Sequence, residues 1–239
     1  MNTPGFPLKP IKDSRPFFLR SEIDRLLSLS MFFGILLVVV RMIHTGRSTF
    51  IFLPWNLFLA YLPYLITEYL SHQRQTARQH KKRDRWIFSA LCLGWLLVIP
   101  NSFYIITDLF HLGDWYNDRL MPSWYDLAMI LSFAWNGLLL GVLSVRQMEK
   151  ILTPRLPAHN ELFFLYPVMW MNALGVYIGR YLRFNSWDLV TDPFHLFRDI
   201  LHMLIHPLRS QMAWGMIFCY SILMTLIYLM LKKISKAIS

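Results

Sequence analysis

The chain has 239 residues, of which 55% are hydrophobic and 16% are charged, and its formal net charge at pH 7 is +10. Because an ordinary soluble domain carries about 25% charged residues, this composition excludes a disordered chain and leaves too few charges to coat a soluble globule. Cys92 and Cys219 both lie within apolar runs, which excludes a disulfide framework and a Cys-x-x-Cys metal site. The composition predicts a polytopic membrane protein, whose positive charge belongs to cytoplasmic loops rather than to a nucleic-acid interface.

Six apolar stretches along the chain are long enough to cross a bilayer, for which a helix needs about 20 largely apolar residues. They cover residues 23–43, 51–70, 86–107, 124–145, 161–182 and 211–231. The first stretch is too long for the apolar region of a cleaved signal peptide, and no Ala-x-Ala cleavage site follows it. We therefore predict an all-α fold, a polytopic membrane helix bundle with six transmembrane helices.

A shorter amphipathic helix is predicted between the fifth and sixth stretches, over residues 193–206. Asp192 is suited to cap such a helix, Pro193 to begin it and Pro207 to end it. Apolar and polar residues follow with helical spacing, which places them on separate faces. The apolar face holds Phe194, Phe197, Leu201 and Leu204, and the polar face holds His195, Asp199, His202 and His206. The segment is too short to span a bilayer, so we expect it to lie on the outer interface or dip into it.

The distribution of Lys and Arg predicts the orientation of the bundle. With a cytoplasmic N-terminus, the inner segments hold 17 of the 24 Lys and Arg residues and the outer segments hold seven. The positive-inside rule then places both termini in the cytoplasm. The predicted organisation is a cytoplasmic segment over residues 1–22, a membrane domain over 23–231 and a basic cytoplasmic tail over 232–239. The basic run over residues 73–85 is interpreted as an inner loop rather than as a nucleic-acid site.

Most of the unusual polar residues fall at the outer ends of the predicted helices. At the outer end of the third span, four of them lie within about 80° of one another on a helical wheel, namely Asn101, Tyr104, Asp108 and His111. Polar residues near the membrane core are costly and usually face the interior of a bundle, so we expect one cavity open to the outer leaflet. The catalytic candidates are Tyr104, Asp108, His111, Asp126 and Asp188, and the substrate-binding candidates are Asn101, Arg180, Arg183, Asn185 and Trp187.

The same residues also have structural interpretations, which the sequence leaves open. Asn101 suits an interhelical hydrogen bond, Trp187 an interfacial aromatic belt and Asp126 the N-terminal dipole of the fourth span. A closed network of ion pairs at the outer ends of the helices is the alternative to a ligand site. Two pairs of glycines spaced four residues apart predict close packing between helices rather than ligand binding. They are Gly137 with Gly141, and Gly175 with Gly179.

No motif in the chain requires a cofactor. Asp108 and His111 share an Asp-x-x-His spacing with Asp192 and His195, which places both side chains of each pair on one helical face. Zinc sites need several converging ligands, so the polar face of the 193–206 helix is interpreted first as a solvated surface. A divalent metal remains a weak alternative, with Asp108, His111, His195, Asp199 and His202 as its candidate ligands.

Four strings of residues in this chain are distinctive when taken together. They lie at 55–60 (Trp-Asn-Leu-Phe-Leu-Ala), 100–112, 124–126 (Trp-Tyr-Asp) and 179–188. With them the chain resembles the DUF1361 family, a group of bacterial integral membrane proteins of similar length and unassigned function. The resemblance covers about residues 50–210. Its most specific part is Arg-Phe-Asn-Ser-Trp-Asp at 183–188, in which Phe184 replaces an expected Trp. It implies a multi-pass protein of the bacterial cytoplasmic membrane and implies no chemistry.

Three functions are consistent with polar residues gathered at the outer ends of the predicted helices. The first is an enzyme that acts on a lipid or lipid-linked anionic substrate, since carboxylates and imidazoles supply acid–base groups and arginines bind phosphates or carboxylates bidentately. The second, nearly level with it, is a non-catalytic membrane protein whose outer face binds a lipid or another protein. A small-solute transporter comes third, because neither an inverted repeat nor a midplane charge cluster is visible. The expected partners are the bilayer and an anionic lipid or lipid-linked ligand, without nucleic acid, and the sequence indicates no oligomeric state.

Overall fold

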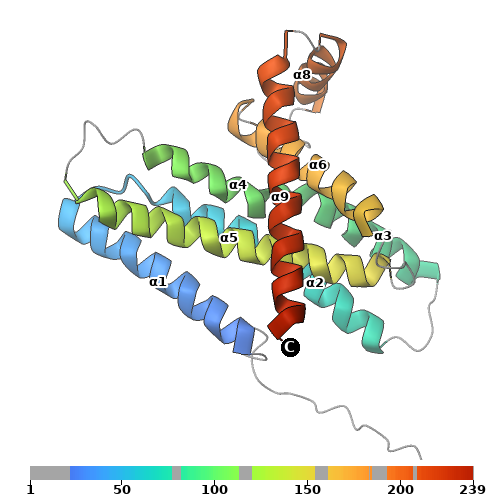
Figure 1. Ribbon diagram of the computed structural model, residues 1–239, viewed down its shortest axis with the longest axis horizontal. Coiled ribbons are helices and arrows are strands. Elements are labelled where there is room, and N and C mark those ends of the chain that lie inside the picture. Colours follow the sequence, from blue (N-terminus) through green and yellow to red (C-terminus); the bar gives the residue numbers. More distant parts are fainter. Residues whose placement is uncertain are drawn as a thin grey trace, which may run out of the picture.

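The computed structural model is built of helices joined by loops (Figure 1). It describes residues 22–76, 82–112, 120–153, 161–182, 184, 193–206 and 209–238, and these ranges contain no strand. The helices are α1 (Glu22–Thr45), α2 (Phe52–Thr76), α3 (Lys82–Val98), α4 (Pro100–Tyr104), the 3₁₀ helix η2 (Ile105–Leu112), α5 (Ser123–Leu152), α6 (Glu161–Arg180), α8 (Pro193–Ile205) and α9 (Gln211–Ile238). The predicted all-α fold class is confirmed.

α5 is the central helix of the bundle. α1, α2, α4 and η2 all pack against it, and Figure 1 shows α1 running alongside it. Met129, Phe133, Leu140 and Met148 are fully buried along its length. A helix that is apolar on nearly all sides belongs in the interior of a bundle, so the sequence of α5 explains why these four elements pack against it.

The third predicted span, residues 86–107, is not one continuous α-helix. α3 ends at Val98, α4 begins at Pro100, and the chain continues as η2 to Leu112. Pro100 lacks a backbone N–H and fits best in the first turn of a helix, which explains the break before it. η2 has eight residues, whereas a 3₁₀ helix rarely exceeds about four. The segment stays helical from Trp86 to Leu112, as predicted for the third span, and its polar candidates lie in the part after Pro100.

Both glycine pairs pack against this broken segment, as predicted. A Cβ atom added to Gly137 in α5 would lie 2.1 Å from Cγ2 of Ile105. One added to Gly175 in α6 would lie 2.6 Å from Cγ of Pro100. Glycine lets the two backbones approach closely, so α5 and α6 together hold α4 and η2 in place. Gly141 and Gly179 likewise face the rings of Phe103 and Tyr104.

Within the described residues, five helical segments are long and apolar enough to cross a membrane. They are Glu22–Thr45, Trp86–Leu112, Ser123–Leu152, Leu162–Arg180 and Gln211–Ser235. α2 corresponds to the remaining predicted span and has 25 residues, but polar residues such as Asn56, Thr67 and Glu68 lower its hydropathy. The described part of the chain is therefore a helix bundle with five clear candidate spans, and a sixth span in α2 stays a prediction.

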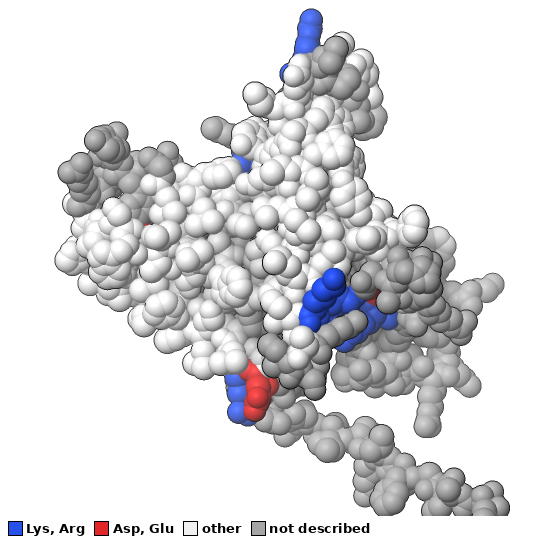
Figure 2. All heavy atoms as spheres, viewed as in Figure 1, with Lys and Arg blue, Asp and Glu red and all other residues white. Residues whose placement is uncertain are grey.

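The outer surface of the bundle is apolar over large areas. Leu26, Leu29 and Phe32 of α1 are each more than half exposed, and Figure 2 shows a face on which charged residues are sparse among the described atoms. Exposed apolar surface on this scale marks contact with a membrane or a partner. With five candidate spans, this surface identifies a multi-pass membrane protein.

α8 confirms the predicted helix to within one residue at its end, whereas its amphipathic, interfacial character stays a prediction. Phe194 and Ile205 are exposed, whereas Met203 is buried with Ala213 and Ile217 of α9. Figure 1 shows α8 at one end of the molecule, next to the start of α9. A helix that exposes apolar residues while anchored by one face suits an interfacial position.

Candidate functional site

Asp108 in η2 is a buried carboxylate with one open oxygen. Its side chain is 1% exposed. Its Oδ2 accepts a hydrogen bond of 2.9 Å from Nδ2 of Asn56 in α2. Its Oδ1 lies 3.8 Å from Nη1 of Arg180, close enough for charge attraction but too far for a hydrogen bond, and it has no hydrogen-bond donor among the described residues. A buried oxygen in this state costs roughly 1–3 kcal/mol or more.

Arg180 links Asp108 to His111. Its Nη1 lies 3.3 Å from Nε2 of His111, and since arginine can only donate, this contact requires an unprotonated Nε2. The Arg180 side chain is 19% exposed, and its guanidinium lies over the ring of Phe110 at 5.5 Å. The His111 ring packs against the ring of Phe52, with centroids 5.1 Å apart. The cluster therefore has a buried end at Asp108 and a more open end at Arg180.

Three elements bring this cluster together. Residues three apart eclipse one another in a 3₁₀ helix, so Asp108 and His111 project from the same side of η2. Asn56 comes from the beginning of α2, and Arg180 is the last residue of α6. A cation is favoured at a helix C-terminus by the helix dipole. Asp108 and His111 thus share Arg180 as a neighbour, in a tighter helix than the α-helix expected from the sequence.

Asp126 belongs to a separate, closed ion pair. Its Oδ1 accepts a hydrogen bond of 2.8 Å from Nε of Arg41, and its Oδ2 lies 3.4 Å from Nη2 of the same residue. The two side chains are 4% and 0% exposed, respectively, for Arg41 and Asp126. The guanidinium also lies 4.4 Å from the ring centroid of Phe50. Both carboxylate oxygens of Asp126 are engaged, so this pair pins α1 to the start of α5.

The comparison with protein families covers the residues whose polar side chains form the Asp108 cluster, together with Asp126 of the second ion pair. A family model described as "Protein of unknown function (DUF1361)" matches residues 55–227, most of the chain. The chain belongs to the DUF1361 family. The predicted resemblance is thereby confirmed, and the matched range contains Asn56, Asp108, Asp126 and Arg180. A search of curated proteins gives no match, and neither does a search of solved structures.

The other predicted site residues of this DUF1361 protein have different positions. Tyr104 packs its ring beside Gly179, one residue before Arg180. Asn101 is half-buried in α4. The structure thus brings Asp108, His111 and Arg180 together, with Tyr104 beside the end of α6, and it gives Asp126 a different partner. Arg183, Asn185, Trp187 and Asp188 lie outside the described residues, and their part in the site stays a prediction.

Only some of the candidate ligands for a divalent metal have side chains that the structure describes. Within the described residues, no group of three or more His, Cys, Asp or Glu side chains could hold a metal ion. His202 of α8 is exposed, and its ring lies 4.8 Å from that of His206. The side chains of His195 and Asp199 lie outside the description, so their role as ligands stays a prediction. Asp108 and His111 instead share Arg180 as their common neighbour.

Two residues of the DUF1361 chain gained importance only in the structure. Asn56 enters the sequence analysis only as part of the string at 55–60, and in the structure it donates a hydrogen bond to the catalytic candidate Asp108. Arg41 counted only as a basic residue of an outer segment. The sequence alone could have identified Arg41 as one half of an ion pair. Arg41 falls inside the first apolar stretch, where an arginine needs a buried acidic partner.

Proposed function

We propose that this protein is an enzyme of the bacterial cytoplasmic membrane that acts on a lipid or lipid-linked anionic substrate at the outer interface. The observation that carries the proposal is the open Oδ1 of Asp108, which is buried and lies 3.8 Å from Arg180. A buried polar atom without a partner is rare in proteins and often marks a functional site. A hydrogen-bond donor on the substrate would satisfy Oδ1 of Asp108.

The chemistry of the cluster fits a substrate with two features. Arg180 can bind a phosphate or carboxylate oxygen, since guanidinium groups recognise such anions bidentately. Asp108 can accept a proton from a hydroxyl or ammonium group of the same substrate and so act as a general base. His111 contacts Arg180 through Nε2, so it can help to orient the guanidinium toward the anionic group of the substrate. The residues therefore favour proton transfer on a molecule that also carries an anionic group.

A second candidate function is non-catalytic binding of the same ligand. It is favoured by the Arg41–Asp126 pair, because Asp126 has both oxygens engaged by one arginine. The described cluster then offers a single open carboxylate, which is enough to hold a headgroup. Among the predicted catalytic carboxylates, Asp188 would then have to supply the second one, and it lies outside the described residues.

The orientation proposed for the protein places Asp108 on the exoplasmic side and both termini in the cytoplasm. The distribution of Lys and Arg supports it through the positive-inside rule. We expect a cysteine introduced at exposed position 150 to be protected from a membrane-impermeant thiol reagent in intact cells. Labelling at that position would contradict the orientation.

The function is tested by complementing a deletion strain and profiling its envelope lipids and lipid-linked metabolites. We expect Asp108→Asn and Arg180→Gln to reproduce the profile of the deletion, because losing a general base lowers a rate by about 10²–10⁴-fold. Glu22→Gln, an exposed change at the start of α1, is the matched control and should rescue fully. Full rescue by Asp108→Asn at normal protein levels would overturn the proposal. A normal lipid profile in the deletion strain, with loss of a copurifying lipid from purified Asp108→Asn protein, would favour non-catalytic binding.

A further inference from the structure

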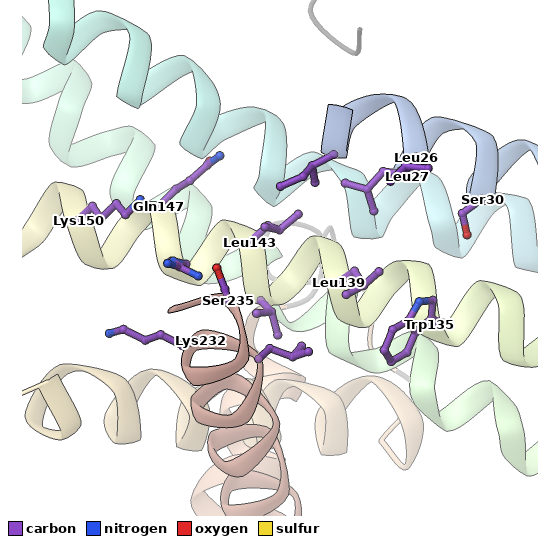
Figure 3. Close-up of a pocket in the computed structure, with 14 residues that line it drawn as sticks. Leu26, Leu27, Ser30, Trp135, Leu139, Leu143, Gln147, Lys150, Lys232 and Ser235 are labelled. Atoms are coloured by element: carbon purple, nitrogen blue, oxygen red, sulfur yellow. The ribbon is translucent and has the colours of Figure 1, made fainter. Parts of the chain in front are cut away.

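A groove of about 640 Å³ lies between α1, α5 and α9, toward the C-terminal end of α5. Its walls are largely apolar, with side chains that include Leu26 of α1 and Leu139 and Leu143 of α5. Figure 3 shows Trp135 toward one end of this groove, and Lys150 and Lys232 toward the other. Its volume is typical of a small-molecule site, and it is far along α5 from Asp126.

The polar end of the groove carries uncompensated positive charge. Arg146 and Lys150 lie one helical turn apart on α5, and therefore on the same face. Within the described chain neither has an ion pair or a side-chain hydrogen bond. Lys232 of α9 also lines the groove, but its Nζ is neutralised by Glu149 at 2.7 and 3.0 Å. Figure 2 shows Lys and Arg gathered near the crossing of α5 and α9.

The length of the groove matches one leaflet of a bilayer. Trp135 and Arg146 are eleven residues apart on α5, which corresponds to about 16 Å at the rise of an α-helix. The hydrocarbon core of a bilayer is about 30 Å thick, so each leaflet contributes about half of that. An apolar groove of this length with cations at its end fits a lipid better than it fits a small soluble anion.

We propose that this groove binds one anionic phospholipid from the leaflet on the basic side of the protein, which the loop charges assign to the cytoplasm. Its phosphate lies between Arg146 and Lys150, and an acyl chain lies along Leu143 and Leu139 toward Trp135. Basic pockets between transmembrane helices bind anionic headgroups in this way. The site is separate from the Asp108 cluster, and neither proposal depends on the other.

The test measures lipid retention by the purified 239-residue chain with native mass spectrometry, using phosphatidylglycerol and zwitterionic phosphatidylcholine as probes. We expect the wild-type protein to retain phosphatidylglycerol preferentially. The double variant Arg146→Gln/Lys150→Gln should bind it about 25-fold more weakly, since each basic residue near a membrane surface contributes about a factor of five. Lys233→Gln/Arg209→Gln removes two exposed positive charges that do not line the groove, and should bind as the wild type does.

A second variant tests the apolar part of the groove. Leu139→Trp places a large ring where the acyl chain would lie, so it should reduce retention of phosphatidylglycerol while the cations remain. Equal retention by the wild type and Arg146→Gln/Lys150→Gln would overturn the proposal. So would unchanged binding by folded Leu139→Trp protein, or displacement of the lipid by inorganic phosphate at low excess, which would indicate a site for free anions.

Discussion

Replacing Asp126 with leucine is expected to lower the free energy of unfolding by about 3–5 kcal/mol, the usual effect of removing one partner from a buried ion pair. Arg41 is 4% exposed and is held by both oxygens of Asp126. Without the carboxylate, its charge would remain buried against Phe50. The measurement is the unfolding midpoint of the purified protein in detergent, followed by the loss of helical circular dichroism.

The double variant Arg41→Met/Asp126→Leu is the control for this prediction. Replacing a whole buried pair with apolar residues of similar volume is often neutral, so most of the lost stability should return. If Asp126→Leu alone left the midpoint unchanged, the pair would not hold α1 to α5. If the double variant were as unstable as the single one, the loss would come from packing rather than from an unpaired charge.

Substituting alanine for Gly137 should disrupt the segment that carries Asp108. The new Cβ would lie 2.1 Å from Cγ2 of Ile105 and 2.9 Å from the carbonyl oxygen of Ser102. Overpacking of this kind costs about 1–3 kcal/mol and occasionally more. Because Ile105 begins η2, the displacement should also move Asp108 away from Asn56. We expect a lower unfolding midpoint together with loss of complementation in the deletion strain.

Gly94→Ala is the matched control, since a Cβ at that position in α3 meets nothing within 4 Å. It should leave complementation intact and raise stability by up to about 1 kcal/mol through helix propensity. Equal behaviour of Gly137→Ala and Gly94→Ala would show that α5 and η2 do not pack as closely as the structure describes.

Much of this fold is predictable from the sequence, because apolar length and helical spacing are local signals. The long runs predict the five candidate spans, and the spacing of Phe194, Leu201 and their neighbours predicts α8. The glycine pairs correctly predict close packing, although the sequence does not name Pro100 and Ile105 as their contacts. The 3₁₀ form of η2 was not predictable, since it depends on how α5 and α6 fit against the chain after Pro100.

The site was predictable in outline only. Hydropathy and charge place Asp108, His111 and Arg180 near one end of the bundle, and the structure brings them into contact. The choice of partner depends on side-chain distances that no sequence pattern contains. Asp126 therefore looked like a member of the same cluster, although Arg41 engages it. Asn56 could not be distinguished from an ordinary interhelical asparagine until its hydrogen bond to Asp108 was seen.

The most direct test of the Asp108 cluster as a ligand site compares the stability of Asp108→Asn with that of Asp126→Asn. In a ligand site, a buried oxygen such as Oδ1 of Asp108 is kept free to bind the ligand, and this lowers the stability of the unliganded protein. The amide oxygen introduced by Asp108→Asn could still accept the hydrogen bond from Asn56, so we expect the free energy of unfolding of this variant to stay within about 1 kcal/mol of the wild type. Asp126→Asn should lose about 3 kcal/mol or more. An equal loss in both variants would contradict the account, because it would make Asp108 part of a structural ion-pair network.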